Sequence, residues 1–292
     1  MILYRLFLVL DALLMKLPYT WRKVLFTSLA EIAHRFAPQR NKIIQTNLDL
    51  VFKNQLSHTE KKEIERYCYR NLALNLLQTM ENRHNSIEDL KKQITFKNRE
   101  IVDTILANGK GIIFVSSHFG NWELGGAALS SLITPVASIY KGFSRQEFDP
   151  YLLEARTRHK MILAEKTGAL KHMAKILKKN GSILLMMDQS ASPKYGIVAD
   201  FFAHPAYHNA VAAQLAAKFN LPIVSVSILS DDEMHHTITF ETPIEVEETS
   251  EEAILNATKK QLVLLEELIK KHPKFWFWCH KRWKGKHFNI YD

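Results

Sequence analysis

A histidine and a glutamate stand five residues apart in the segment GIIFVSSHFGNWELGGAAL, residues 111–129. His118 follows an apolar run typical of a buried strand, and Glu123 falls in the first turn of the helix predicted next, where the helix dipole keeps a carboxylate ionised. A carboxylate behind an imidazole fixes its tautomer and stabilises the imidazolium that forms when the other ring nitrogen takes a proton. The spacing therefore predicts a general base, His118, held by Glu123, that activates a hydroxyl group.

The alternative is a histidine that merely ends a strand, and the surrounding elements must decide. Apolar runs at 111–117, 135–140, 182–188, 222–229 and 235–246 predict strands, and the segments between them have helical character. Strands that alternate with helices indicate a mostly parallel or mixed central sheet covered on both faces, an α/β fold. His118 ends the first strand and Asp188 the third, which is where functional groups gather in such folds.

The first part of the chain has a different pattern. Residues 21–108 show apolar positions at three- and four-residue spacing, and Ser57 with Glu60 fits a capping box. We expect a membrane-associated helix over 1–20, followed by one domain over 21–292 that is helical over 21–108 and α/β over 109–292. The opening MILYRLFLVLDALLMKLPYTW is strongly apolar, but Asp11 and the missing small-residue cleavage site argue against a removed signal peptide. A buried first helix of the domain is the alternative.

The composition of the chain indicates which classes of molecule it binds. The chain has 39 Lys and Arg against 30 Asp and Glu, a formal net charge of +9, which favours anionic partners. The tail FWFWCHKRWKGK combines tryptophans with cations, as membrane interfaces do, and we expect an anionic membrane surface rather than nucleic acid. Two cysteines in 292 residues make a disulfide framework improbable on composition alone. His204 and His208 have helical metal-ligand spacing, but Pro205 interrupts them and no metal site is predicted.

HFGNWE resembles the His-x4-acid motif of the lysophospholipid acyltransferase superfamily, and its Glu and Asn-Trp variant is similar to the bacterial lipid A late acyltransferases. Further segments resemble this family in the same order along residues 111–284: SIYKGF, LLEARTRHK, GSILLMMDQ, ADFFAHPAYHNAVAAQLA and HPKFWFWCHKRWK. Four positions depart from the family pattern. Lys141 in SIYKGF stands in place of arginine. Ala203 and Lys160 stand where glycine is common, and His208 stands where threonine is usual.

The resemblance implies a function and a role for each site residue. The expected reaction moves a fatty acyl chain from an acyl carrier protein thioester to a hydroxyl of a lipid A precursor. In that reaction His118 is the base and Glu123 its holder. Arg156 or Arg158 binds a substrate phosphate, and Asp188 orients that arginine or the acceptor sugar. The backbone around Gly120 and Asn121, or a nearby arginine, supplies oxyanion donors. The expected substrate-binding residues are Gly120, Asn121, Lys141, Gln189, His280 and Arg282.

No cofactor and no metal are expected, since the acyl carrier protein delivers an activated acyl group. The expected location is the cytoplasmic face of the bacterial inner membrane. An acyltransferase for another lysolipid, a glycolipid or an aminolipid fits the same residues. From other classes, a metal-dependent hydrolase built on His118, Glu123 and Asp188, or a non-catalytic basic membrane-binding protein, stays open.

Overall fold

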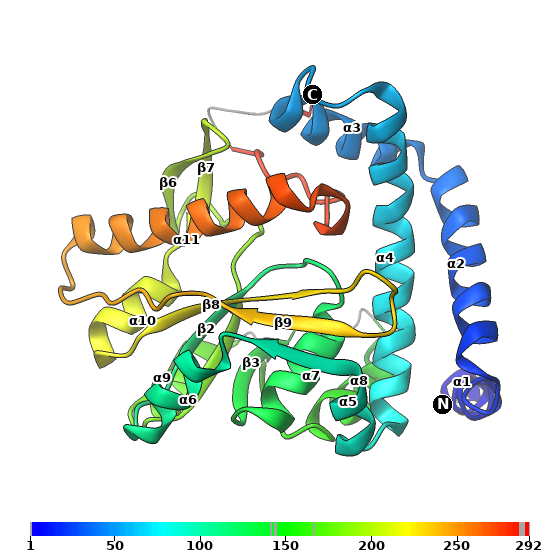
Figure 1. Ribbon diagram of the computed structural model, residues 1–292, viewed down its shortest axis with the longest axis horizontal. Helices are drawn as coiled ribbons and strands as arrows, with labels where there is room; N and C mark the ends of the chain where they lie inside the picture. Colours follow the sequence, from blue (N-terminus) through cyan, green and yellow to red (C-terminus); the bar gives the residue numbers. More distant parts are fainter. Residues whose placement is uncertain (1, 141, 143–144, 166, 286–289, 292) are drawn as a thin grey trace.

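A twisted seven-stranded sheet organises the computed structural model, which describes residues 2–140, 142, 145–165, 167–285 and 290–291 (Figure 1). Its strand order is β1-β9-β8-β2-β5-β3-β4. All neighbours pair in parallel except β8 and β9, which are antiparallel. The strands are β1 (Ile94–Lys97), β2 (Ile113–Ser116), β3 (Val136–Tyr140), β4 (Ile162–Glu165), β5 (Ser182–Met186), β8 (Ile223–Leu229) and β9 (His236–Phe240). The predicted mainly parallel α/β sheet is confirmed.

Each face of the sheet buries its own core. One face packs on α5 (Ile87–Gln93), α6 (Arg99–Ala107) and α7 (Trp122–Leu132), and the other on α9 (Ala169–Leu177), α10 (Val211–Phe219) and α11 (Glu251–Lys271). The central strands β2 and β5 are apolar except for one terminal serine each, because both of their faces are covered. Buried apolar area of this kind is the main stabilising term of the domain.

Helices of the first part of the chain stand beside the sheet rather than on it. They are α1 (Ile2–Leu14), α2 (Tyr19–Arg35), α3 (Pro38–Phe52) and α4 (His58–His84). Figure 1 shows α4 running along the side of the sheet, with α2 on its outer side. The predicted capping box begins α4: the Ser57 side chain accepts from the Glu60 N–H, and Glu60 accepts from the Ser57 N–H. A short helix, α8 (Asp149–Thr157), packs against α4.

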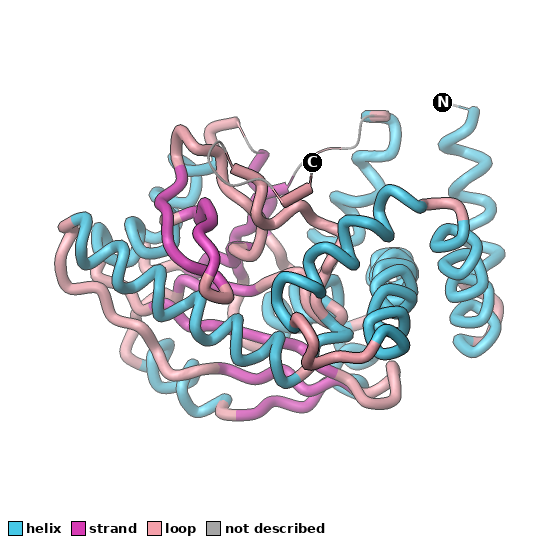
Figure 2. The backbone as a smooth tube through the Cα atoms, turned by 90° about the horizontal axis from the view of Figure 1, so that it is seen from above, coloured by secondary structure: helices cyan, strands magenta, loops and turns pink. Residues whose placement is uncertain are grey.

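One buried acid fixes α1 to the body of the protein. Asp11 is fully buried and accepts from Arg83 Nη1 at 2.9 Å, His84 Nε2 at 2.9 Å and the Tyr151 hydroxyl at 2.8 Å. The ring of Phe7 packs edge-on against Tyr151 at 4.8 Å. Asp11 therefore points inward, and large apolar side chains of the same helix stay exposed. Figure 2 shows this helix at the outer edge of the molecule. Over the described residues, none of the helices has both the length and the apolar character needed to cross a membrane.

The sequence prediction missed four strands. Residues 21–108 contain β1 as well as helices, and β4 follows α8. A separate hairpin pairs β6 (Gly196–Phe201) with β7 (His204–Asn209), where we expected only a motif segment. β1 and β4 have four residues each and lie at the two edges of the sheet, so half-exposed positions hide their apolar pattern.

Two departures from the family pattern fall on left-handed backbone. Phe202 and Ala203, with φ of 52° and 59°, form the two-residue turn between β6 and β7, and Lys160, with φ of 62°, follows α8. Glycine adopts this conformation without steric cost, whereas a residue with a Cβ pays about 1 kcal/mol. The usual glycines at positions 160 and 203 thus reflect backbone geometry rather than chemistry.

Ala203→Gly should therefore stabilise the protein by about 1 kcal/mol, because it removes the strain of a Cβ at positive φ. Chemical denaturation measures the change. The matched control is Ala174→Gly inside α9, which should destabilise by about 1 kcal/mol through loss of helix propensity. If both substitutions lower the stability, the turn does not strain Ala203.

Candidate active site

A hydrogen bond between two strand ends forms the centre of the site. His118 and Asp188 each lie two residues beyond Ser116 and Met186, which are paired neighbours on β2 and β5. His118 Nδ1 donates to Asp188 Oδ1 over 2.9 Å. Because Nδ1 is used in this way, Nε2 is the ring nitrogen left for a substrate proton. The pairing of parallel strands thus builds a His–Asp dyad.

The acid of this dyad is held on both oxygens. Asp188 is 3% exposed, and its Oδ2 accepts from the indole Nε1 of Trp276 over 3.1 Å. The same C-terminal segment holds the histidine, since the Phe277 N–H donates to the His118 carbonyl over 2.9 Å. Residues 275–277 therefore fix both members of the dyad.

The pair alters both titrations. Burial lowers the pKa of His118, but the charge of Asp188 and its hydrogen bond outweigh it, so that the His118 pKa lies above the ordinary value of 6.5. Burial raises the pKa of Asp188, and the charge and hydrogen bond of His118 more than reverse this, so that the Asp188 pKa lies below the ordinary 3.8. Asp188 therefore stays ionised, and His118 becomes a stronger base than a free imidazole.

Glu123 does not hold the histidine, and this part of the sequence prediction is wrong. Its carboxylate accepts from Arg156 Nη2 at 2.6 Å and Arg156 Nε at 3.2 Å, a two-pronged ion pair. Glu123 adds only its charge to the raised pKa of His118, after the contributions of Asp188. Motif spacing suggested the nearer acid in sequence, whereas the sheet register brings a residue 70 positions away.

The structure separates the two candidate arginines. Arg156 ends α8 and lines the cleft beside His118 and Glu123. Arg158 lies outside it, is exposed, and donates to the Asn85 carbonyl. Arg156 gives two N–H groups to Glu123, which leaves three of its five for another acceptor. It is the arginine placed to contact a substrate.

A cleft of about 630 Å³ opens at these residues. His118, Glu123, Arg156 and Gln189 are among the polar residues that line it. Most of the remaining wall is apolar, from Leu76, Trp122, Ile139, Leu152, Met161, Leu184, Met187 and Val211. His118 also contacts Trp122 edge-on, with ring centroids 5.3 Å apart. Polar groups converging on an apolar cleft suit a ligand with a polar head and a hydrocarbon part.

The turn after His118 is structural at Gly120. Its N–H donates to the Phe275 carbonyl over 3.0 Å, so it is not the oxyanion donor that we expected. A Cβ at Gly120, where φ is 60°, would meet the Ile228 carbonyl oxygen at 2.0 Å. Asn121 caps α7: its side chain accepts from the Leu124 N–H. Among the expected donors, Arg156 therefore fits an oxyanion better than the backbone of Gly120.

Three predicted substrate-binding residues remain, and the structure describes two of them. Lys141 falls outside the described residues. His280 accepts from the Ser190 N–H at 3.1 Å, and burial together with nearby Lys284 lowers the pKa of His280 to about 4. Arg282 is fully buried, where it donates to the Tyr207 carbonyl and to His208 Nδ1. His280 and Arg282 thus support the loops behind the dyad instead of facing the cleft, and His208 serves as an acceptor for Arg282.

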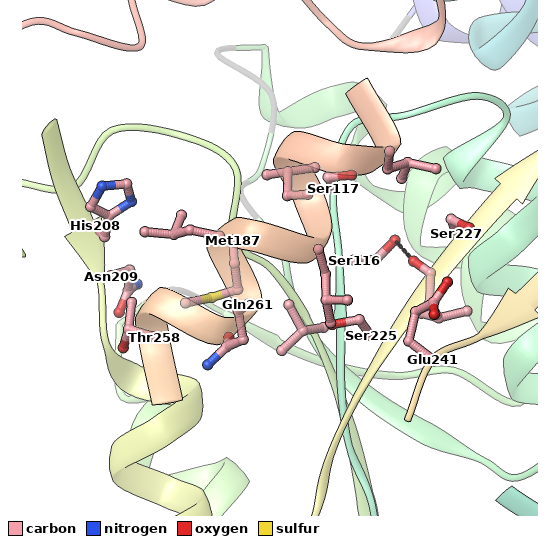
Figure 3. Close-up of a pocket in the computed structure, with 16 residues that line it drawn as sticks. Ser116, Ser117, Met187, His208, Asn209, Ser225, Ser227, Glu241, Thr258 and Gln261 are labelled. Atoms are coloured by element: carbon pink, nitrogen blue, oxygen red, sulfur yellow. Dashed lines mark hydrogen bonds between the residues drawn. The ribbon is translucent and has the colours of Figure 1, made fainter. Parts of the chain in front are cut away.

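A second, smaller cavity of about 60 Å³ lies between the sheet and α11. Figure 3 shows His208 and Asn209 on one side of it, and Ser225, Ser227 and Glu241 on the other. Met187 and Asn209 line both this cavity and the cleft, so the two spaces share a wall. None of the dyad residues borders it.

Sequence reasoning missed Trp276 as a partner of Asp188. Its only signal was position, in an aromatic segment with no local link to residue 188. Tryptophan offers one N–H donor, and a buried indole almost always finds an acceptor. A buried tryptophan and a buried strand-end aspartate would have made a reasonable pair to test.

Replacing Asp188 should move the titration of His118. In Asp188→Asn the attracting charge is gone and burial remains, so we expect the His118 pKa to fall from above 6.5 to below it. NMR of the imidazole resonances from pH 5 to 9, assigned with His118→Gln, measures this. The matched control is Asp232→Asn, because Asp232 pairs with His235 and not with His118. An unchanged His118 pKa in Asp188→Asn would contradict the dyad.

Comparison with known proteins places the chain in a family. The model of the bacterial lipid A biosynthesis acyltransferases matches residues 2–285. The chain is 23% identical over 278 residues to the lipid A biosynthesis lauroyltransferase of Escherichia coli (strain K12), covering 94% of this chain and 89% of that protein. It is 21% identical over 282 residues to lipid A biosynthesis acyltransferase 2 of Shigella flexneri, with coverage of 94% and 87%. The resemblance seen in the motifs is confirmed along nearly the whole chain, and the protein belongs to the bacterial lipid A biosynthesis acyltransferases.

Proposed function

We propose that this protein transfers a fatty acyl chain from the thioester of an acyl carrier protein to a hydroxyl of a lipid A precursor, as a late step of lipid A assembly. The observation that carries the proposal is the His118–Asp188 hydrogen bond at the wall of a largely apolar cleft. A base with a raised pKa, backed by an ionised acid, is what a hydroxyl nucleophile needs at neutral pH.

In this reaction His118 acts first as the base and then as the acid. His118 Nε2 takes the proton of the acceptor hydroxyl while the hydroxyl oxygen attacks the carbonyl carbon of the thioester. The new C–O bond forms, the C–S bond breaks, and the proton on His118 passes to the leaving sulfur. Asp188 stabilises the imidazolium between these two steps without being protonated itself.

Arg156 has a separate task in this proposal. Its free N–H groups face the cleft, where a phosphate of the acceptor or the developing oxyanion accepts them. Glu123 holds the guanidinium in place through two hydrogen bonds. The His-x4-Glu motif then combines a base and an arginine holder rather than a base and its own acid.

The test is acyl transfer by purified protein with acyl carrier protein thioester and a lipid A precursor, followed by mass spectrometry of the lipid. His118→Ala should lower kcat by about 10²–10⁴-fold with the fold intact. Arg156→Lys should raise the acceptor KM, because lysine cannot keep both bonds to Glu123 and bind a phosphate. Arg158→Lys is its matched control and should leave KM unchanged.

Two substrate comparisons sharpen this experiment. Acyl-coenzyme A in place of the carrier protein thioester should react poorly if the +9 chain recognises an acidic carrier. Lysophospholipid, glycolipid and aminolipid acceptors test the rival acyltransferases. Near-normal turnover by His118→Ala would contradict the proposed base. A chelator-sensitive hydrolysis of the thioester would favour the metal-dependent hydrolase instead.

We further propose that α1 and α2 lie on the cytoplasmic surface of the bacterial inner membrane. Large apolar side chains are exposed along both helices: Ile2, Leu6, Val9, Leu10 and Leu13 on α1, and Trp21, Val24, Leu29 and Ile32 on α2. We call these nine residues the outer apolar face. Groups of exposed large apolar side chains mark interaction sites, and helices with one apolar and one polar face lie in the membrane interface.

The outer apolar face predicts a vesicle-binding defect. Trp21→Gln combined with Ile32→Gln should weaken binding to phosphatidylglycerol-containing vesicles, measured by flotation, about 10²–10⁴-fold, because the two burials together are worth about 3–6 kcal/mol. Leu170→Gln with Val263→Gln, equally exposed on α9 and α11, is the matched control and should bind like the unaltered protein. Equal losses in both double variants would show that the outer apolar face is not the membrane contact.

A further inference from the structure

We infer that a stripe of four amide side chains on α4 is a positioning device for the catalytic turn, residues 118–123. Asn71, Asn75, Gln78 and Asn82 lie at spacings of four, three and four, so they share one face of the helix. We call them the amide stripe. The inference rests on the proposed function for its kinetic effect, but not for its structural one.

The stripe is buried where a helix normally presents leucine or valine to its neighbour. Its four side chains are between 1% and 6% exposed. A buried amide costs about 1–3 kcal/mol if its polar atoms lack partners, so it persists where each atom has a defined acceptor or donor. Every member of the stripe has such a partner, and each reaches the catalytic turn directly.

Two members hold the first half of the turn. Asn71 Nδ2 and Asn75 Nδ2 both donate to the Gly120 carbonyl, each over 3.0 Å. The N–H of Gly120 donates to the Phe275 carbonyl, which Asn71 Nδ2 also reaches at 3.5 Å. Gly120 is thus clamped by α4 and the segment 275–277, at a position that no Cβ can enter.

The second half of the turn is held by the same face of α4. Asn75 Oδ1 accepts from the Glu123 N–H over 3.2 Å, and Asn82 Nδ2 donates to the Glu123 carbonyl over 3.1 Å. Gln78 Oε1 accepts from Asn121 Nδ2 over 3.1 Å, and Gln78 Nε2 donates to Asn82 Oδ1 over 2.9 Å. Asn75 is the central member, because it alone bonds to both halves of the turn.

The clamp matters for chemistry because the turn carries both working residues. His118 enters it and Glu123 leaves it, so its backbone sets the distance from His118 to Asp188 and from Glu123 to Arg156. A displacement of about 1 Å at reacting groups costs about 10²-fold in rate. None of the four amides touches the ring of His118, so they are positioning residues.

The experiment is Asn75→Ala, assayed for acyl transfer and for the His118 titration by NMR. We expect kcat to fall about 10²-fold with substrate KM nearly unchanged, because the turn relaxes while the cleft walls stay. The His118 pKa should move back toward 6.5 as its bond to Asp188 loosens. Asn71→Ala is the milder variant: Asn75 still holds Gly120, so kcat should fall only about threefold, and the double variant should lose more than the product of both.

The matched control is Tyr69→Phe. Tyr69 lies on another face of α4, and the substitution removes its hydrogen bond to Asn41 of α3. It should lower stability without changing kcat or the His118 pKa. The inference is overturned if folded Asn75→Ala keeps kcat within twofold and an unchanged His118 pKa, or if Tyr69→Phe has the same effects. Should the unaltered protein fail to transfer acyl groups, the proposed function falls alone, because the NMR titration still tests the clamp.

Discussion

The hydrogen bond from His118 to Asp188 is the constraint on which the site depends. It exists because β2 and β5 are parallel neighbours, and their register places the carboxyl ends of both strands side by side. The bond needs a buried, ionised carboxylate, which the protein satisfies from two sides, with an imidazole N–H and an indole N–H. The segment 275–277 and α4 keep these two strand ends in place.

Two distant segments supply that support. The C-terminal residues 275–277 add short antiparallel contacts to the catalytic turn and bring Trp276 to Asp188. Next to this segment, α4 contributes polar side chains at positions where packing alone would favour apolar ones. Apolar contacts are tolerant of small shifts, whereas hydrogen bonds fix direction and distance. A polar helix face beside the turn therefore gives up some hydrophobic stabilisation for positional accuracy.

The first helix, α1, also combines a buried polar contact with an exposed apolar surface. The carboxylate of Asp11 is buried and accepts hydrogen bonds from Arg83, His84 and Tyr151, which ties α1 to α4 and α8. The polar residue that interrupts the apolar N-terminus is thus an anchor, and the apolar residues are left outside. Since α8 also carries Arg156, the segment that we assign to the membrane surface is packed on the helix that enters the cleft.

The amino-acid sequence by itself determined the alternation of strands and helices, the capping box of α4, and His118 at the end of a buried strand, because these depend on local periodicity and short-range hydrogen bonds. It also placed Asp188 at a strand end and named Arg156 as one of two candidate arginines. Only the tertiary structure decided which acid meets the histidine. Motif spacing favoured Glu123, but strand order and register joined residues 118 and 188 and left Glu123 for Arg156. Register, the edge strands β1 and β4, and the contacts of Trp276 and Asn75 all depend on segments far apart in the chain, and no local pattern of residues encodes those distances.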